Sequence, residues 1–154
     1  MALEATENRI ADAILTALQA IGSAPTSFWS TSPLPASRGI PNDALVPNAK
    51  PMIFLQHLGT EPQDAESGTA THRARATFAV WCVSSDFTAG ERITLNLKAD
   101  VLRAIFAVEN TILTVAAYGG WPSGYTVHED MAPAGFWCGQ QLIYFDFNMT
   151  HTDP

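Results

Sequence analysis

The sequence predicts an α+β domain in which two helices pack on a mixed or mainly antiparallel sheet, with a hairpin arm extending from the sheet. Two segments repeat apolar residues at helical three- and four-residue steps, and several others alternate apolar and polar residues as strands do. The chain has 154 residues, of which 47% are hydrophobic, so it is long enough for one core and short for two. We therefore expect a single domain over residues 1–154.

The first predicted helix runs from Thr6 to Ile21. Its apolar residues fall on one stripe, namely Ile10, Ala13, Ile14, Ala17, Leu18 and Ile21. Gly22 supplies a natural stop, and Pro25 follows soon after. The short segment Thr26 to Ser30 fits either a first strand or an extended arm.

A proline-rich stretch over residues 31–50 follows this segment. Each proline fixes φ and removes a backbone donor, so neither a regular helix nor a central strand is expected there. The stretch also contains the apolar residues Leu34, Ile40, Leu45 and Val46, which argue against pure disorder. We expect a long loop that lies against its own domain or against a neighbouring chain.

Two strands are predicted next, at Met52 to Leu58 and at Thr71 to Ser84. The first half of the second strand is amphipathic and carries Arg73 and Arg75, whereas its second half is apolar on both faces. This pattern predicts an arm over residues 59–75 that projects from the body, while the second half of the strand crosses the core. In an assembly the two arginines are expected to meet carboxylates of an acidic neighbour.

The second predicted helix runs from Ala89 to Ala107. Thr88 and Glu91 have the spacing of a capping box at its start. Its apolar stripe comprises Ile93, Leu97, Val101, Ala104, Ile105 and Val108. The more solvent-exposed positions are predicted to be Glu91, Asn96, Lys98, Asp100 and Arg103.

The C-terminal part of the chain is predicted to be strands. Ile112 to Tyr118 and Tyr125 to Glu129 are strand candidates, separated by a turn-forming cluster at residues 119–124 that contains three glycines and a proline. The last strand, from Phe136 to about Thr150, alternates so that one side is buried and the other is solvated or faces a partner.

Charge and composition exclude some classes of function. The formal net charge of −7 repels polyanions, so a free-standing nucleic-acid binder is not expected. No apolar run approaches the roughly 18 residues that span a bilayer, and the N-terminus carries acidic Glu4 and Glu7 where a leader is basic, so a soluble, non-exported protein without a membrane partner is expected. Cys82 and Cys138 both fall in predicted strands, and buried free thiols are favoured over a disulfide or a reactive site.

No catalytic, cofactor or metal motif is found. The histidines are isolated from one another in sequence: His57, His72, His128 and His151. His128 and Glu129 are adjacent on a predicted strand end, where neighbouring side chains point to opposite faces. We therefore expect no enzyme activity, no cofactor and no metal.

The large aromatic residues are candidates for either core or interface positions. Trp81 and Trp137 lie in predicted strands, where core packing is favoured. Trp121 lies among glycines and proline, and it fits a core plug as well as an interface anchor. The candidate protein-interface residues are accordingly Arg73, Arg75 and Trp121.

The order of parts resembles a known family. The segments that carry the resemblance are the opening helix Thr6 to Ile21, the strand Pro51 to Leu58, the strand ending Phe78 to Val83, the helix containing Leu97 to Leu102, and the closing strand Gln141 to Met149. Together they resemble the tail terminator, or tail-completion, proteins of long-tailed bacteriophages. The likeness is one of layout, length and hydrophobic rhythm over most of the chain, without a signature motif.

This resemblance implies a structural virion protein that assembles in the host cytoplasm as a ring, expected to be a hexamer. Such a ring caps the tail tube, ends tube polymerisation and joins the tail to the head connector protein, while DNA passes through its lumen without sequence-specific binding. One alternative is a head–tail connector or neck protein. An alternative of another class is a small α+β enzyme or ligand-binding domain with a pocket near Tyr125, His128 and Glu129.

Overall fold

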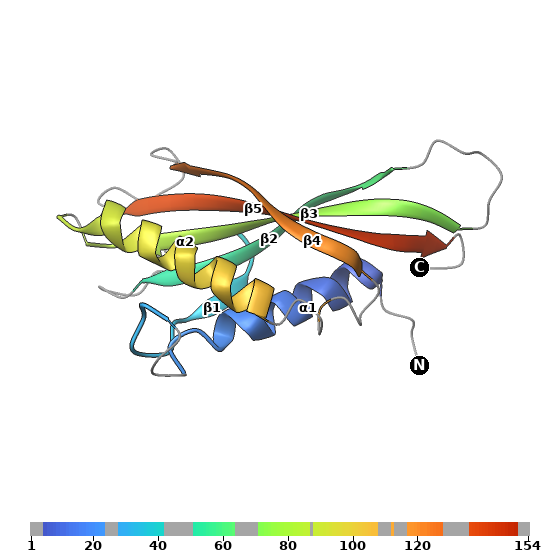
Figure 1. Cartoon of the computed structure of the whole chain (residues 1–154). Helices are drawn as coiled ribbons and strands as arrows, with labels where there is room; N and C mark the ends of the chain where they lie inside the picture. The colour runs from blue at the N-terminus through green and yellow to red at the C-terminus, as the bar shows by residue number, and fades with distance from the viewer. Residues whose placement is uncertain are drawn as a thin grey trace.

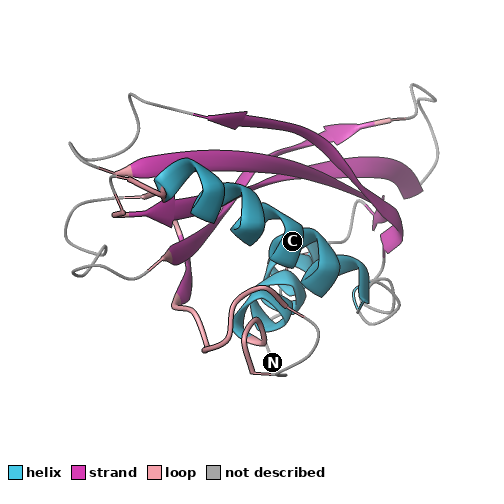
Figure 2. Ribbon diagram, turned by 60° about the vertical axis from the view of Figure 1, so that its left-hand side comes forward, coloured by secondary structure: helices cyan, strands magenta, loops and turns pink. Residues whose placement is uncertain are grey.

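The computed structural model has two layers, a long twisted sheet and a pair of helices that both lie on one of its faces (Figures 1 and 2). It describes residues 5–23, 28–41, 51–63, 71–86, 88–107, 112, 117–127 and 136–150. The elements in chain order are α1 (Thr6–Gln19), β1 (Ala36–Arg38), β2 (Met52–Pro62), β3 (Thr71–Ser84), α2 (Gly90–Ala107), β4 (Ala117–Val127) and β5 (Trp137–Thr150). The predicted α+β class is confirmed.

The strand order in the sheet is β1-β2-β3-β5-β4. Only the β1–β2 pair is parallel, and the other three pairs are antiparallel, so the sheet is mixed. β3 and β5 pair along their whole length, from Thr71 opposite Thr150 to Ser84 opposite Trp137. Within the described residues 59–63 and 71–75, the segment predicted as an arm is part of the sheet, because β5 runs beside β3 there and Ala74 is buried in the core. The tip, residues 64–70, lies outside the described residues.

The helix-facing side of the sheet holds the main core. Its members alternate along the strands and meet the apolar stripe of each helix, and among the largest are Ile10, Ile14, Leu18, Ile53, Phe78, Leu97, Ile105, Phe145 and Phe147. The stripe predicted for the first helix is confirmed, since all its residues are buried except the partly buried Ala13. Gly22, at φ +80°, ends the helical segment in a conformation that favours glycine.

A second apolar cluster lies on the opposite face of the sheet. It contains Met52, Phe54, Ala79, Trp81, Val83 and Cys138. The second half of β3 is thus buried on both faces, as predicted, whereas its first half carries arginines on the face away from the helices.

The proline-rich stretch contains one short strand, which the loop prediction missed. β1 occupies the space between Pro35 and Pro41 and forms the outer edge of the sheet beside β2. The carbonyl of Pro35 accepts a hydrogen bond from the Ile53 amide (3.0 Å). Proline lacks a backbone N–H but keeps its carbonyl oxygen, so Pro35 can still form this bond just before the strand. Leu34 and Ala36 pack against the core, so this part lies against its own domain; residues 42–50 lie outside the described residues.

The turn predicted over residues 119–124 is wrong. These residues belong to one continuous strand, β4, which pairs with β5 through two register shifts, between Ala117 and Gly119 and between Pro122 and Tyr125. Pro122 is tolerated because β4 is an edge strand: its outer side has no neighbouring strand, so a missing backbone N–H on that side breaks no hydrogen bond of the sheet. Gly120 is needed because a Cβ there would overlap the ring of Phe145.

The start of α2 is capped differently from the prediction. Oδ1 of Asp86 accepts hydrogen bonds from the backbone amides of Thr88 (2.9 Å) and Ala89 (2.8 Å). The capping oxygen therefore comes from Asp86, and the structure does not assign this role to the predicted Thr88–Glu91 pair.

Asp100 also departs from the prediction, which placed it among the more solvent-exposed positions of α2. Its side chain is fully buried, with 0% exposure. Oδ1 accepts a hydrogen bond from the amide of Trp29 (2.7 Å), while Oδ2 accepts from the amide (2.9 Å) and the hydroxyl (2.8 Å) of Ser30. These donors make burial of the carboxylate tolerable, and they fasten the segment before β1 to α2.

The two cysteines are free and buried, as predicted. Cys82 lies opposite Gly139 and Cys138 lies opposite Val83, so the thiols are on opposite faces of neighbouring strands and do not converge. Burial raises the pKa of Cys82, and it raises the pKa of Cys138 to about 11. Both side chains act as small apolar core residues.

These pKa shifts predict a loss of stability in alkaline solution. In the unfolded chain the thiols ionise near their ordinary pKa of 9.0, whereas in the folded protein both stay largely protonated at pH 10, because burial raises the pKa of Cys82 and raises that of Cys138 to about 11. Unfolding then releases protons, so the free energy of unfolding should fall by up to about 1.4 kcal/mol per pH unit for each thiol above pH 9. Urea unfolding at pH 7.5 and pH 10 measures this fall. The Cys82→Ala/Cys138→Ala variant should show a smaller fall, and an equal fall would contradict the assignment.

Candidate protein-interaction surface

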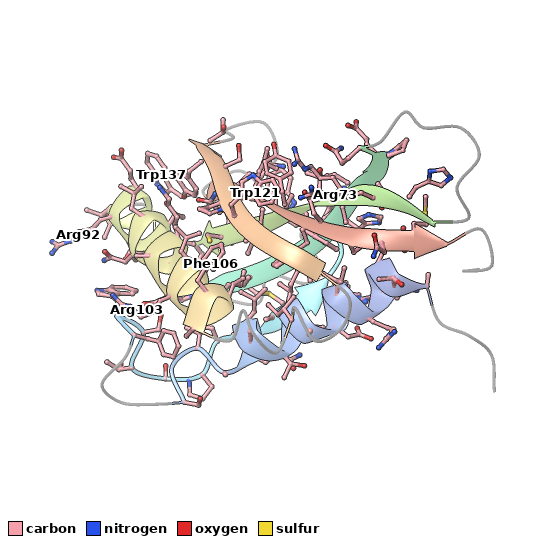
Figure 3. The ribbon with its side chains drawn as sticks, turned by 45° about the vertical axis from the view of Figure 1, so that its right-hand side comes forward. Arg73, Arg92, Arg103, Phe106, Trp121 and Trp137 are labelled. Atoms are coloured by element: carbon pink, nitrogen blue, oxygen red, sulfur yellow. The ribbon has the colours of Figure 1, made fainter. Side chains whose placement is uncertain are left out.

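The three residues predicted as interface candidates come together on the sheet face away from the helices. Arg73 and Arg75 lie two residues apart on β3 and share that face, and Trp121 reaches it from β4. Figure 3 shows Arg73 and Trp121 on the side of the sheet away from the helices. Two β5 residues lie between them: Asp146 opposite Arg75, and Tyr144 opposite Trp121. We call these five residues the arginine–aromatic cluster.

Asp146 holds both arginines. Its Oδ1 accepts a hydrogen bond from Nε of Arg75 (2.9 Å), and its Oδ2 accepts from Nη2 of Arg73 (2.9 Å) and Nη2 of Arg75 (3.3 Å). The carboxylate side chain is 1% exposed, whereas the side chains of Arg73 and Arg75 are 50% and 33% exposed. The hydrogen bond to Asp146 raises the pKa of Arg75. A buried anion thus positions two charged groups that reach the surface.

Aromatic rings complete the cluster. The guanidinium carbon of Arg75 lies 4.5 Å from the centroid of the Trp121 ring and 5.7 Å from that of Tyr144. The two rings are 6.1 Å apart at an interplanar angle of 43°. These distances are within the range of cation–π and aromatic contacts. Trp121 is partly buried, so it is neither a core plug nor a fully exposed side chain.

Sequence reasoning found three of the five residues and missed Asp146 and Tyr144. The alternation of the last strand does place both on its predicted solvated or partner-facing side. Only the register of β3 against β5, which the sequence does not reveal, brings Asp146 opposite Arg75. The carboxylate that the arginines were expected to find on a neighbour is thus also provided within their own chain.

Removing the charge of Asp146 should be measurably destabilising. Asp146→Asn leaves two guanidinium groups without their carboxylate and places a donor amide beside them, so we expect a loss of about 1–3 kcal/mol in the free energy of unfolding. Arg73→Gln is the matched control, and because Arg73 is half exposed it should cost less than about 1 kcal/mol. Urea unfolding of both variants tests this, and equal costs would show that Asp146 does not organise the cluster.

A second set of polar contacts links α1 to β2. The Thr60 hydroxyl donates to Oε1 of Glu7 (3.1 Å), and Nε2 of His57 lies 3.1 Å from the same hydroxyl, beside a cavity of about 220 Å³. A nucleophilic triad needs the imidazole between the hydroxyl and the carboxylate. Here the hydroxyl lies in the middle, so the arrangement suits a structural link between α1 and β2.

The alternative pocket near Tyr125, His128 and Glu129 lies mostly outside the described residues. Tyr125 itself faces α2, where Nζ of Lys98 lies 5.0 Å from its ring centroid, and burial raises its pKa to about 12. Within the described ranges, no three His, Cys, Asp or Glu side chains are grouped so as to hold a metal ion. Neither described helix is long and apolar enough to cross a membrane.

A comparison with solved structures finds a neighbour that covers most of this chain. A chain in a structure of the virion of a native gene transfer agent particle matches with a TM-score of 0.39 and 13% sequence identity, over 94% of this chain and 92% of that chain. No protein-family model and no curated protein matches the sequence.

Proposed function

We propose that this chain is a structural virion protein that forms a ring on the end of a phage tail tube. The ring ends tube polymerisation and joins the tail to the head connector, and the protein has no enzymatic role. The layout of the sequence supports this proposal through its resemblance to tail terminator proteins. The net charge of −7 suits a channel through which DNA moves without adhering.

The observation that carries the proposal is the arginine–aromatic cluster. Arginine, tryptophan and tyrosine are the residue types that dominate binding energy at protein interfaces. Here they are partly exposed, and their positions are set in advance by a buried carboxylate. A partner that docks on a preordered surface loses less side-chain entropy on binding. The cluster therefore has the chemistry of recognition between proteins.

Solution mass is the direct test of ring formation. Light scattering and negative-stain imaging of the purified protein should reveal a ring, with six copies as the expected number. Added to a growing cognate tail tube, the ring should stop elongation. A monomer at tens of micromolar, or tubes that continue to grow after addition, would contradict the proposal. Rings that bind heads and leave tubes growing would favour a connector role.

The cluster should be required for this activity. Arg73→Gln/Arg75→Gln and Trp121→Ala remove its cations and its largest ring, and each should weaken assembly or tube capping at least about tenfold. Arg9→Gln, an exposed arginine on α1, is the matched control and should behave as wild type. Melting temperatures verify that the variants are folded. Wild-type assembly and capping by both folded cluster variants would remove the cluster from the interface.

A further inference from the structure

The edge strand β4 contains a bulge beside the arginine–aromatic cluster. The register of β4 against β5 shifts between Pro122 and Tyr125, because β4 takes three steps there and β5 takes two. Two residues of β4, Ser123 and Gly124, thus lie opposite one residue of β5, Leu142. Such a bulge interrupts the ladder of the sheet and leaves backbone groups that need other partners.

The bulge places two aromatic side chains on opposite faces of the sheet. Trp121 and Tyr125 are four residues apart, so a regular strand would put both on the same face. In β4, Trp121 lies opposite Tyr144 on the face away from the helices, whereas Tyr125 faces α2 beside Lys98. The extra residue reverses the alternation, so the cluster contains Trp121 while α2 packs on Tyr125.

Both aromatic positions depend on this register. The Tyr125 ring occupies the space that a side chain at Gly139 would fill. If regular pairing continued from Tyr125, Trp121 would lie opposite Phe145 on the core side. That position has no room for it, because even a Cβ at Gly120 would overlap the Phe145 ring. The bulge therefore gives each of the two rings a position that fits it.

The side chain of Gln141 spans the bulge. Its Nε2 donates to the carbonyl of Ser123 on β4 (2.6 Å) and to the carbonyl of Leu142 on β5 (2.9 Å). Gln141 is 0% exposed and lies on the core side of β5, where the next residues in alternation, Ile143 and Phe145, are apolar. Burial of an amide costs free energy unless its groups form hydrogen bonds. The two bonds offset that cost and connect the strands where the ladder is interrupted.

We infer that Gln141 is a positioning residue that fixes the bulge of β4 and thereby holds Trp121 in the arginine–aromatic cluster. Its amide sets the register of β4, and this register decides on which face Trp121 lies. The effect on register needs no partner protein. Its consequence for assembly rests on the proposed function, in which the cluster is an interface.

The test reads the position of Trp121 through the Nε–H signal of Arg75 in nitrogen–proton NMR spectra. The guanidinium carbon of Arg75 lies 4.5 Å from the Trp121 ring centroid, so the ring current shifts this signal, and the hydrogen bond from Nε to Asp146 protects its proton from exchange. Trp121→Ala gives the position of the signal without the ring. Gln141→Met keeps the length of the side chain and removes its donors. We expect it to move the signal toward the Trp121→Ala position and to weaken assembly or tube capping at least about tenfold.

Gln19→Met is the matched control. Nε2 of Gln19 donates to the carbonyl of Ala36 (3.4 Å), so this variant removes a bond from a glutamine to the backbone at the other edge strand, β1. It should leave the Arg75 signal and assembly as in wild type. Melting temperatures verify folding. If Gln141→Met does not fold, Gln141→Asn, which has a shorter side chain, replaces it and should shift the signal in the same direction.

The outcomes separate the role of Gln141 from the proposed function. An unchanged Arg75 signal in the folded variant would overturn the role of Gln141 and leave the proposed function standing. An equal shift in Gln19→Met would trace the change to a general loosening and would also overturn that role. A shifted signal with wild-type assembly would retain the role of Gln141 and remove Trp121 from the interface. A wild type that does not assemble would contradict the ring, and the Arg75 signal would still decide the role of Gln141.

Discussion

Replacing Asp100 by alanine should lower the free energy of unfolding by about 3–5 kcal/mol. The substitution leaves three donors without their acceptor: the amide of Trp29 and the amide and hydroxyl of Ser30. These groups are buried or partly buried, so water does not readily replace the carboxylate, and each lost bond adds the cost of an unsatisfied group. Urea unfolding measures the loss.

Two further variants give this prediction its specificity. Asp12→Ala removes an exposed carboxylate on α1 whose ion pair with Arg38 is solvated, and it should cost less than about 1 kcal/mol. Asp100→Asn keeps one oxygen acceptor and should fall between the two. Amide exchange at Trp29 and Ser30 should accelerate more in Asp100→Ala than elsewhere in the protein. Equal costs for Asp100→Ala and Asp12→Ala would show that the buried carboxylate does not hold the segment before β1.

The elements that the sequence predicts well are those in which local pattern and tertiary environment agree. The strand predicted at residues 71–84 is found with those bounds, because its alternation and its apolar second half both follow from its central position in the sheet. The two helices are found within two residues of their predicted bounds, because each has one face fixed by the core. In these segments, periodicity alone carries the necessary information.

The elements that the sequence predicts poorly depend on partners far along the chain. β4 contains glycines and a proline that favour a turn, and only its pairing with β5 makes it a strand. Asp100 is polar on a helix, and hydrogen-bond donors 70 and 71 residues away make its burial tolerable. Asp146 meets Arg73 across a separation of 73 residues. In each case the local sequence favoured a turn or an exposed polar residue, whereas contacts with residues far along the chain produce a strand or a buried carboxylate.

The candidate surface shows the same division. Arg73, Arg75 and Trp121 are identifiable as interface-type residues from their sequence setting, whereas the buried anion that organises them is not.

The two sides of α2 can be separated by a matched pair of leucine truncations. Leu97 is fully buried against the sheet, whereas Leu95 is 46% exposed on the same helix. Leu97→Ala should cost about 2–5 kcal/mol in the free energy of unfolding, because it removes buried methyl groups and leaves a cavity in the core. Leu95→Ala should change it by less than about 0.5 kcal/mol. Both values come from urea unfolding of the dissociated subunit.

This difference follows from helix geometry, since residues two apart lie on nearly opposite sides of a helix. A loss below about 0.5 kcal/mol for Leu97→Ala would show that the core side of α2 was assigned wrongly.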